Sequence, residues 1–296
     1  MAGAPSDTPA VARRRVRLAV RLGRRATGMS QGDVARMLGW SLSKMQRIES
    51  GEVAVSGTDL RALLDIYGVA DPDEIDRLLE DTRTSRRQRW WTAPEFRQHL
   101  TKGTLQLLQF ESQAAAIHVY QPHLIPGLLQ TPEMAQKVLS WFGDALSGEA
   151  RRVRYDVRML RREQVIERDD PPSYFLALDE AVLKRELGGA RVAAEQLEAL
   201  AETARRPRVR VRVVPMAVGG IAALEGPITI LDMAEDDPED AVLYREYDVN
   251  DELIHDLEQL RAARTRFMKI WDMAYNEEAS LRRISAQAAV LRSSLD

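Results

Sequence analysis

The chain has 296 residues, of which 45% are hydrophobic and 29% are charged, as is usual for a globular protein. This length exceeds what one small core needs, so we expect two domains. The absence of cysteine excludes disulfides and thiolate zinc sites and favours a reducing cytoplasm. No apolar run approaches the roughly 20 residues of a membrane span, and no signal pattern begins the chain, so neither membrane insertion nor secretion is expected.

Charge is distributed unevenly along the chain. Between Met1 and Ser50 there are ten Arg or Lys and three Asp or Glu, a net charge of about +7, whereas the whole chain carries −3. The remaining residues therefore carry about −10. A basic head on an acidic body is typical of a DNA-binding domain joined to a domain with another role. The alternative is a basic helix that is only solvated.

The predicted elements of the basic part are helices. Residues 1–9 are small, polar and proline-containing, and we expect them to form a disordered tail. Ser30 and Ser41 are placed as N-caps, and Gly39 and Gly68 as helix ends. A domain over residues 10–84 is therefore predicted. Its five helices are expected at Ala10–Ala26, Ser30–Leu38, Leu42–Glu49, Thr58–Tyr67 and Pro72–Thr84.

A basic and aromatic segment, residues 85–91, is predicted to connect this domain to an α+β regulatory and dimerisation domain over residues 92–296. Helices are expected as far as Arg168, and short β-rich runs follow Pro171 and Pro172. A small sheet is predicted, with strands at Ser173–Leu178, Val209–Val214, Pro227–Met233 and Ala241–Tyr247. Later helices are predicted at Glu180–Leu187, Arg191–Ala204, Asp251–Tyr275 and Glu277–Leu291.

Two short helices joined by a tight glycine turn carry the functional prediction. They lie in SQGDVARMLGWSLSKMQRIESG, residues 30–51, with Asp33 as a capping-box partner for Ser30. This arrangement leaves the outer face of the second helix free, and a major groove about 12 Å wide admits one α-helix. A helical hairpin with solvated polar residues is the alternative. The shared core is predicted from Val34, Ala35, Leu38, Met45 and Ile48.

The same segment resembles the Xre and phage-repressor class of helix-turn-helix regulators. The usual pattern of that class is Ser-Gln-x-x-Leu-Ala-x-x-Leu-Gly, followed by Ser, an apolar residue and Glu-x-Gly. The resemblance covers Arg13 to Leu79, and it departs at Val34, where leucine is commoner and the core is kept. It implies DNA binding, and because one recognition helix covers few bases, a homodimer on paired half-sites.

The resemblance also implies roles for single residues. Gln31 would contact a phosphate and brace the recognition helix. Leu42, Ser43 and Arg47 would face base edges, and Lys44 would reach a base or the backbone. A guanidinium pairs bidentately with a guanine edge, which makes Arg47 the best reader.

Other side chains of this domain are given supporting roles by their chemistry. Ser41 and Ser43 are short hydrogen-bond donors suited to phosphate. Glu49 is expected to be structural, closing its helix or pairing with an arginine. One or two of the seven arginines of the first helix are expected to touch phosphate, with the rest solvated.

The C-terminal part resembles the corresponding domain of actinobacterial WhiJ-like regulators, which is marked by a Pro-Gly-Leu-Leu-Gln-Thr segment, here starting at Pro126. The resemblance implies a small acidic partner protein encoded nearby. Thr131 should cap a helix with Pro132 at its first position. Leu128 and Leu129 are expected to be core, with a ligand pocket or partner groove as the alternative.

A possible partner or ligand surface is predicted around this segment. Arg158, Arg161 and Arg162 are expected on one helix near a facing Glu180, as surface ion pairs or as an anion site. The predicted surface comprises Tyr120, Pro126, Gly127, Gln130, Arg158, Arg161 and Glu180.

Enzyme motifs are missing from the sequence. It has no phosphate-binding loop, no Gly-x-Gly-x-x-Gly after a strand and no Gly-x-Ser-x-Gly elbow. His118 and His123 are five residues apart, which does not suit one helix face, so neither a metal nor a cofactor is predicted. The prediction is a sequence-specific regulator controlled by a small protein partner. The alternatives are control by a small-molecule effector, or a DNA-tethered enzyme of unrecognised activity.

Overall fold

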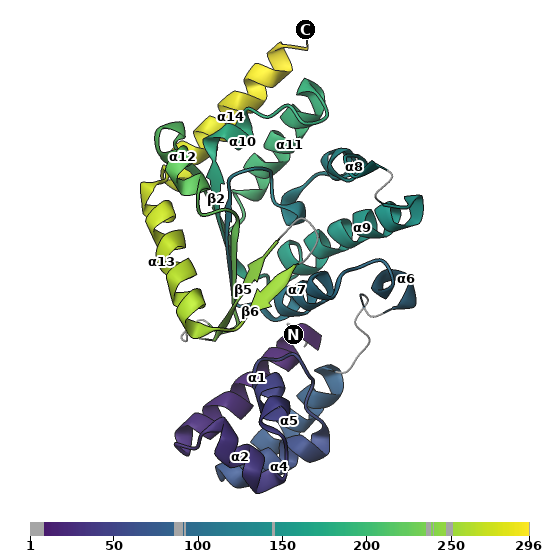
Figure 1. Cartoon of the computed structure of the whole chain (residues 1–296), viewed down its shortest axis with the longest axis vertical. Coiled ribbons are helices and arrows are strands. Elements are labelled where there is room, and N and C mark those ends of the chain that lie inside the picture. Colours follow the sequence, from purple (N-terminus) through teal and green to yellow (C-terminus); the bar gives the residue numbers. More distant parts are fainter. Residues whose placement is uncertain are drawn as a thin grey trace, which may run out of the picture. The chain divides into compact units, whose positions relative to one another are not determined.

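Helices and strands divide unequally between the two parts of the chain. The computed structural model describes residues 9–85, 91, 93–143, 146–234, 238, 240–246 and 251–295. They belong to two compact units, Met1–Thr92 and Ala93–Asp296, each described by itself (Figure 1). The first unit is helical and the second has a six-stranded sheet with helices, which confirms the predicted fold class. Residues 1–8 of the tail predicted over residues 1–9, and residues 86–90 of the predicted connector, lie outside the described residues. Pro9, the last residue of the predicted tail, begins the first helix instead.

The N-terminal unit consists of helices that begin and end at small polar residues and glycines. Ser30, Ser41 and Ser56 each accept a hydrogen bond from the backbone three residues ahead, which satisfies an otherwise unpaired helix N–H. Gly39 ends its helix at φ +66°, where other residues are strained. The helices are α1 (Pro9–Ala26), α2 (Gln31–Leu38), α3 (Leu42–Glu49), α4 (Gly57–Tyr67) and α5 (Pro72–Ser85).

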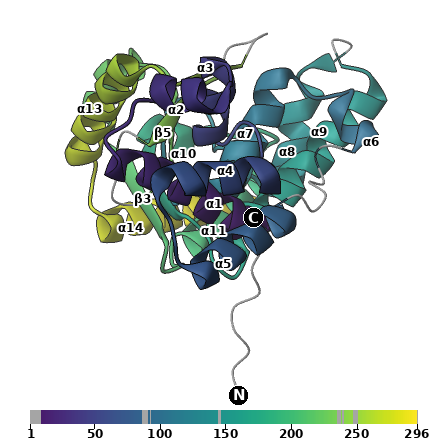
Figure 2. The same cartoon turned by 90° about the horizontal axis from the view of Figure 1, so that it is seen from below.

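The core of this unit contains the apolar residues predicted for it. Val34, Met45 and Ile48 are buried, and Leu38 packs against them partly exposed. They meet buried leucines of α4, so the two helices of the motif are held by a third. Figure 2 shows α2 and α3 next to each other in this unit.

The C-terminal unit is built on one mixed sheet. The strand order is β3-β2-β1-β4-β5-β6, parallel from β3 to β1 and antiparallel from β1 to β6. The strands are β1 (Ala116–Gln121), β2 (Ser173–Asp179), β3 (Val209–Val214), β4 (Ile228–Asp232), β5 (Ala241–Arg245) and β6 (Glu252–Ile254). The helical elements are α6 (Pro94–Arg97), α7 (Lys102–Gln113), η2 (Gly127–Leu129), α8 (Pro132–Ser140), α9 (Gly148–Arg161), η4 (Arg162–Ile166), α10 (Glu180–Leu183), α11 (Ala190–Thr203), α12 (Met216–Ala223), α13 (Leu257–Met273) and α14 (Glu277–Ser293).

Helices cover both faces of the sheet. On one face α11 and α14 pack together and share a core with Ile117, Leu176 and Val211. On the other face α13 packs through Phe267 against residues that include Tyr120 (Figure 1). The side chains of one strand therefore alternate between two separate cores, as the pleat requires.

The outer edges of β3 and β6, the two outermost strands of the sheet, differ in how they are covered. At β3, the Val213 N–H donates to the Ser280 hydroxyl at 2.8 Å, and the Val213 carbonyl accepts from the Tyr275 N–H at 2.9 Å. The start of α14 thus satisfies backbone groups that face away from β2. At the other edge, β6 has three residues, and Glu252 is exposed.

Several elements differ from the prediction. β1 lies in a segment expected to be helical, and it forms because β2 and β4 pair with it on both sides. β6 and a connection replace the start of the helix predicted from Asp251, and α13 begins only at Leu257. The helix α12 was not predicted, since two glycines interrupt its sequence.

A partly buried polar cluster links β1, β4 and α13. The His118 Nε2 lies 2.8 Å from an Asp232 carboxylate oxygen, and the Arg264 guanidinium donates to both oxygens of that carboxylate. Burial alone raises the pKa of Asp232, but the hydrogen bonds from His118 and Arg264 outweigh it and the pKa lies below its usual value of 3.8.

This shift predicts a pH-dependent contribution to stability. A carboxylate whose pKa is lowered on folding stabilises the native state above its unfolded pKa, and the contribution is lost as pH falls through the folded pKa. We expect Asp232→Asn to reduce the free energy of unfolding at pH 7 by about 1–3 kcal/mol and the difference to shrink below about pH 4. Urea unfolding across pH checks this, with exposed Glu278→Gln as control. A difference that stays constant into acid would contradict it.

Candidate nucleic-acid interface

The helix-turn-helix is formed by α2, the turn through Trp40, and α3. Ser30 accepts from the Asp33 N–H at 3.2 Å, and Asp33 accepts from the Ser30 N–H at 3.0 Å, so the predicted capping box is present. The Ser30 hydroxyl also donates to the Asp33 carboxylate at 2.6 Å, and this bond, together with the one from the Ser30 N–H, holds the pKa of Asp33 below its usual value. Ser41 accepts from the Lys44 N–H at 3.1 Å and fixes the start of α3. Ser41 is thus occupied as a cap, although its residue remains exposed.

The two faces of α3 differ sharply in exposure. Met45, Ile48 and Glu49 are buried against the rest of the unit. Leu42, Ser43 and Arg47, which were predicted to face bases, are exposed, as is Gln46 between them. The exposed side chains lie one helical turn apart, so they form one continuous stripe. Gln46 is a member of this stripe that the sequence reasoning did not single out.

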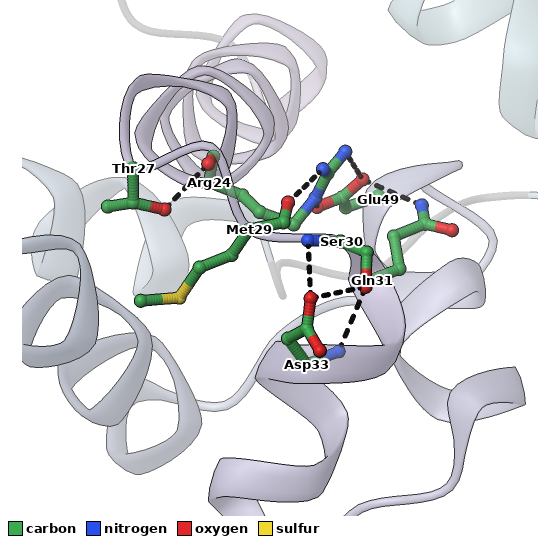
Figure 3. A network of polar contacts seen from close by, with 7 residues as sticks. All are labelled: Arg24, Thr27, Met29, Ser30, Gln31, Asp33 and Glu49. Atoms are coloured by element: carbon green, nitrogen blue, oxygen red, sulfur yellow. Dashed lines mark hydrogen bonds and ion pairs between the residues drawn. The ribbon is translucent and has the colours of Figure 1, made fainter.

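Glu49 organises the contacts beneath this stripe. Its carboxylate accepts from the Arg24 Nε at 2.6 Å and from the Arg24 Nη2 at 3.0 Å, a bidentate ion pair between α1 and α3 (Figure 3). The Arg24 Nη1 also donates to the Met29 carbonyl at 2.8 Å. The hydrogen bond to Glu49 raises the pKa of Arg24 above its usual value. These contacts agree with the structural role predicted for Glu49.

Gln31 is attached to the same carboxylate. Its Nε2 donates to a Glu49 oxygen at 2.7 Å, so the side chain connects the start of α2 to the end of α3 (Figure 3). The phosphate contact suggested for Gln31 is not tested by this geometry. The contact between Arg24 and Glu49 is visible only in the structure. Nothing in the sequence spacing of these two residues indicates that they meet.

Two basic residues of α3 have acidic partners near the surface. The Lys44 ammonium lies 3.1 Å from Asp59 of α4 and 3.7 Å from the centre of the Trp40 ring. The Arg47 Nε lies 3.4 Å from Glu52. Both pairs are partly exposed, so they are weak and water-accessible. DNA phosphates and bases would compete with these carboxylates for Lys44 and Arg47.

The arginines of α1 do not behave alike, and part of the prediction for them is wrong. Arg13 and Arg17 are buried, and the Arg13 Nε donates to the Ser85 carbonyl at 2.7 Å. Arg15 lies 3.3 Å from Asp81 of α5. Arg13 and Arg17 are therefore not solvated, whereas the side chain of Arg15 is 42% exposed. Arg13 and Arg15 link α1 to α5, because a long side chain can reach across the packed helices.

In the C-terminal unit, η2, α7 and α9 bring together several residues of the predicted surface. The Arg158 Nη1 donates to the Gln130 Oε1 at 2.9 Å. Arg161 forms a bidentate pair with Glu111, at 2.9 Å and 2.6 Å. Gly127 lies against both guanidiniums. Glu111, buried on α7, is a site residue that the sequence reasoning missed.

Other predicted members of that surface lie elsewhere. Glu180 does not face the arginines of α9: it accepts from the Met216 N–H at 2.8 Å and lies 3.9 Å from Arg283. Tyr120 is completely buried on the α13 side of the sheet, where burial raises its pKa above the usual value. Tyr120 was misplaced because β1 was not predicted, and a strand sends adjacent side chains to opposite faces. Glu180 begins α10 directly after β2 and contacts α12 and α14 instead.

The predicted Pro-Gly-Leu-Leu-Gln-Thr bend has the expected local structure. Pro126, Leu128 and Leu129 are buried, which confirms the core role of the leucines. Thr131 accepts from the Met134 N–H at 3.3 Å and Pro132 begins α8, as predicted.

Comparison with protein families assigns both parts of the chain. Residues 104–286 match the family described as a domain of unknown function (DUF5753), and residues 15–78 match a helix-turn-helix domain. The first match covers more than half of the chain, so the chain belongs to the DUF5753 family. The second indicates a DNA-binding regulator. No curated protein and no solved structure matches the chain.

The described part of the chain lacks two further kinds of feature. No helix there is long and apolar enough to cross a bilayer. The same residues contain no group of three or more His, Cys, Asp or Glu side chains arranged to hold a metal ion.

Proposed function

We propose that this protein is a sequence-specific transcriptional regulator of the Xre type. It binds paired DNA half-sites as a homodimer, and α3 of each protomer reads one half-site. The observation that carries the proposal is the exposed stripe of Leu42, Ser43, Gln46 and Arg47 on a helix fixed from below by Glu49. A rigid helix with polar and basic groups on its outer face can read base edges in a major groove.

Lys44 and Gln31 would support this contact from the sides of the helix. Release of Lys44 from Asp59 and of Arg47 from Glu52 frees two cations for DNA. Both ion pairs are partly exposed, so opening either one costs about 1 kcal/mol or less. Ser41 and Ser43 remain close enough to the helix start to donate to phosphate oxygens.

Fluorescence anisotropy against duplexes that tile the region upstream of the gene tests the proposal, at two salt concentrations. One duplex bound about 1000-fold more tightly than the others supports a sequence-specific regulator. Equal, weak and steeply salt-dependent binding to every duplex is non-specific and contradicts it for these targets. Sedimentation with the tight duplex then counts the protomers, for which two are expected.

The preferred duplex allows a test of base reading by Arg47. We expect Arg47→Ala to weaken specific binding by about 1–3 kcal/mol and to leave non-specific binding and its salt slope almost unchanged. Arg282→Ala is the matched control, since that arginine is also exposed and paired with one carboxylate but lies in the C-terminal unit. A loss of equal size on all duplexes would reject Arg47 as a base reader.

We further propose that the DUF5753 unit passes a signal to the DNA-binding unit, from a small acidic protein or, as the alternative, from a small-molecule effector. The alternative is supported by Arg158 and Arg161, whose partly buried guanidiniums both lie near Gly127. A change in DNA affinity on addition of the neighbouring small protein supports the first form.

A further inference from the structure

The positive charge of Arg158 is less well neutralised than that of the neighbouring Arg161. Arg161, one turn further along α9, is fully paired with Glu111. The only hydrogen bond found for Arg158 among the described residues is to the neutral Gln130 carboxamide. Arg158 has five N–H donors, so most of its donor capacity is unused.

Hydrogen bonds hold the Gln130 side chain in one orientation beside Arg158. Gln130 is buried, and its Nε2 donates to the Ile125 carbonyl at 2.9 Å. That bond orients the Oε1 towards Arg158, and it sets the direction of the guanidinium. A preoriented arginine loses less entropy when it binds a ligand.

The Arg158 side chain is partly buried, so water solvates its positive charge less well than it would on an open surface. Burial, and then the neighbouring Arg161, lowers the pKa of Arg158 to about 10. Glu246 acts on Arg158 only through space, without a hydrogen bond among the described contacts. The cluster therefore favours the arrival of an anion.

Gly127 keeps the approach to Arg158 open. Its φ is not in the left-handed region, so the backbone does not require glycine here. A Cβ at this position would lie 3.6 Å from the Arg158 Nε and 4.0 Å from an Arg161 nitrogen. A longer side chain would cover the two guanidiniums, and glycine leaves their edge uncovered.

We propose that Arg158, oriented by Gln130 and uncovered at Gly127, binds the oxyanion of a small molecule, a carboxylate or a phosphate. Two guanidinium N–H groups pair well with two oxygens of either anion. Arg161 and Glu111 act as the fixed wall beside the site. The inference deepens the effector-responsive form of the proposed function and rests on that form. Binding is measured without DNA, so its failure is separate from a failure of DNA recognition.

Isothermal titration calorimetry of the full chain with inorganic phosphate, and separately with acetate, tests the proposal at constant ionic strength. We expect one saturable site for at least one of the two anions. If only phosphate or only acetate binds, that result identifies which group the site recognises. Arg158→Gln should weaken it about tenfold or more. Arg47→Ala, in the DNA-binding helix, and exposed Arg282→Gln should leave it unchanged.

A second variant separates binding from folding. Gly127→Val retains every charge and fills the approach, so it should also weaken the anion about tenfold, and it carries the test where Arg158→Gln does not fold. Thermal unfolding without anion gives a further readout. Arg158→Gln should not be less stable than the native chain, because it removes a poorly compensated buried charge. Absence of a saturable site, or a site that both variants leave intact, overturns the proposal.

Discussion

Glu49→Ala should lower the free energy of unfolding of the N-terminal unit by about 3–5 kcal/mol. The variant leaves the Arg24 guanidinium partly buried without its carboxylate, and it releases the Gln31 amide from its acceptor. Removing one partner of a buried ion pair costs more than the pair contributes, because the remaining charge stays desolvated. Loss of this magnitude would populate open forms of α3 and abolish DNA binding together with stability.

Hydrogen exchange of the amides in α2 and α3, followed by mass spectrometry on the full chain, measures this effect locally. Glu80→Ala is the control, because its carboxylate pairs with Arg83 on the exposed surface of α5 and should change stability by less than about 0.5 kcal/mol. Exchange rates in Glu49→Ala that match those of the control would show that the network does not hold α3 in place.

Glu111→Ala should destabilise the C-terminal unit by about 3–5 kcal/mol. Its carboxylate is buried and is the acceptor of both Arg161 hydrogen bonds. When the Glu111 carboxylate is removed, the positive charges of Arg158 and Arg161 lie on one side of α9 without a hydrogen-bonded carboxylate. Glu111→Gln should lose less, since the amide oxygen still accepts one hydrogen bond.

Urea unfolding monitored by circular dichroism measures this loss. Glu278→Ala removes an exposed carboxylate from its pair with Arg282, so it serves as the control and should shift the free energy by less than about 0.5 kcal/mol. A loss under about 1 kcal/mol in Glu111→Ala would mean that water reaches Arg161 easily, in contrast with its buried position.

The DNA-binding unit was predictable because its signals are local. Each cap, turn glycine and apolar spacing acts within a few residues, so Ser30, Gly39 and Ser41 define the ends of helices before any tertiary contact forms. The contact between Arg24 and Glu49 was not predictable. It joins residues 25 positions apart, and sequence spacing does not say which arginine of α1 turns inward.

The C-terminal unit contains more structure that only tertiary contacts create. β1 has His118 and Gln121 among its apolar residues, so its alternation is weak, and pairing on two sides makes it a strand. β6 is too short to be recognised alone and forms against β5. Without β1, the sequence could not show that Tyr120 lies in the core on the α13 side of the sheet, away from the arginines of α9.

The hydrogen bonds at Val213 have a consequence for self-association. An open strand edge invites a second chain to continue the sheet, and β3 would be the natural place for such strand addition. Ser280 and Tyr275 already occupy the outward-facing groups of Val213, so a pairing strand would first have to displace the start of α14. A dimer that joins two sheets edge to edge would therefore have to use β6, whose exposed Glu252 would be repelled by its own copy. Helical surfaces are thus the favoured route to a dimer of this chain.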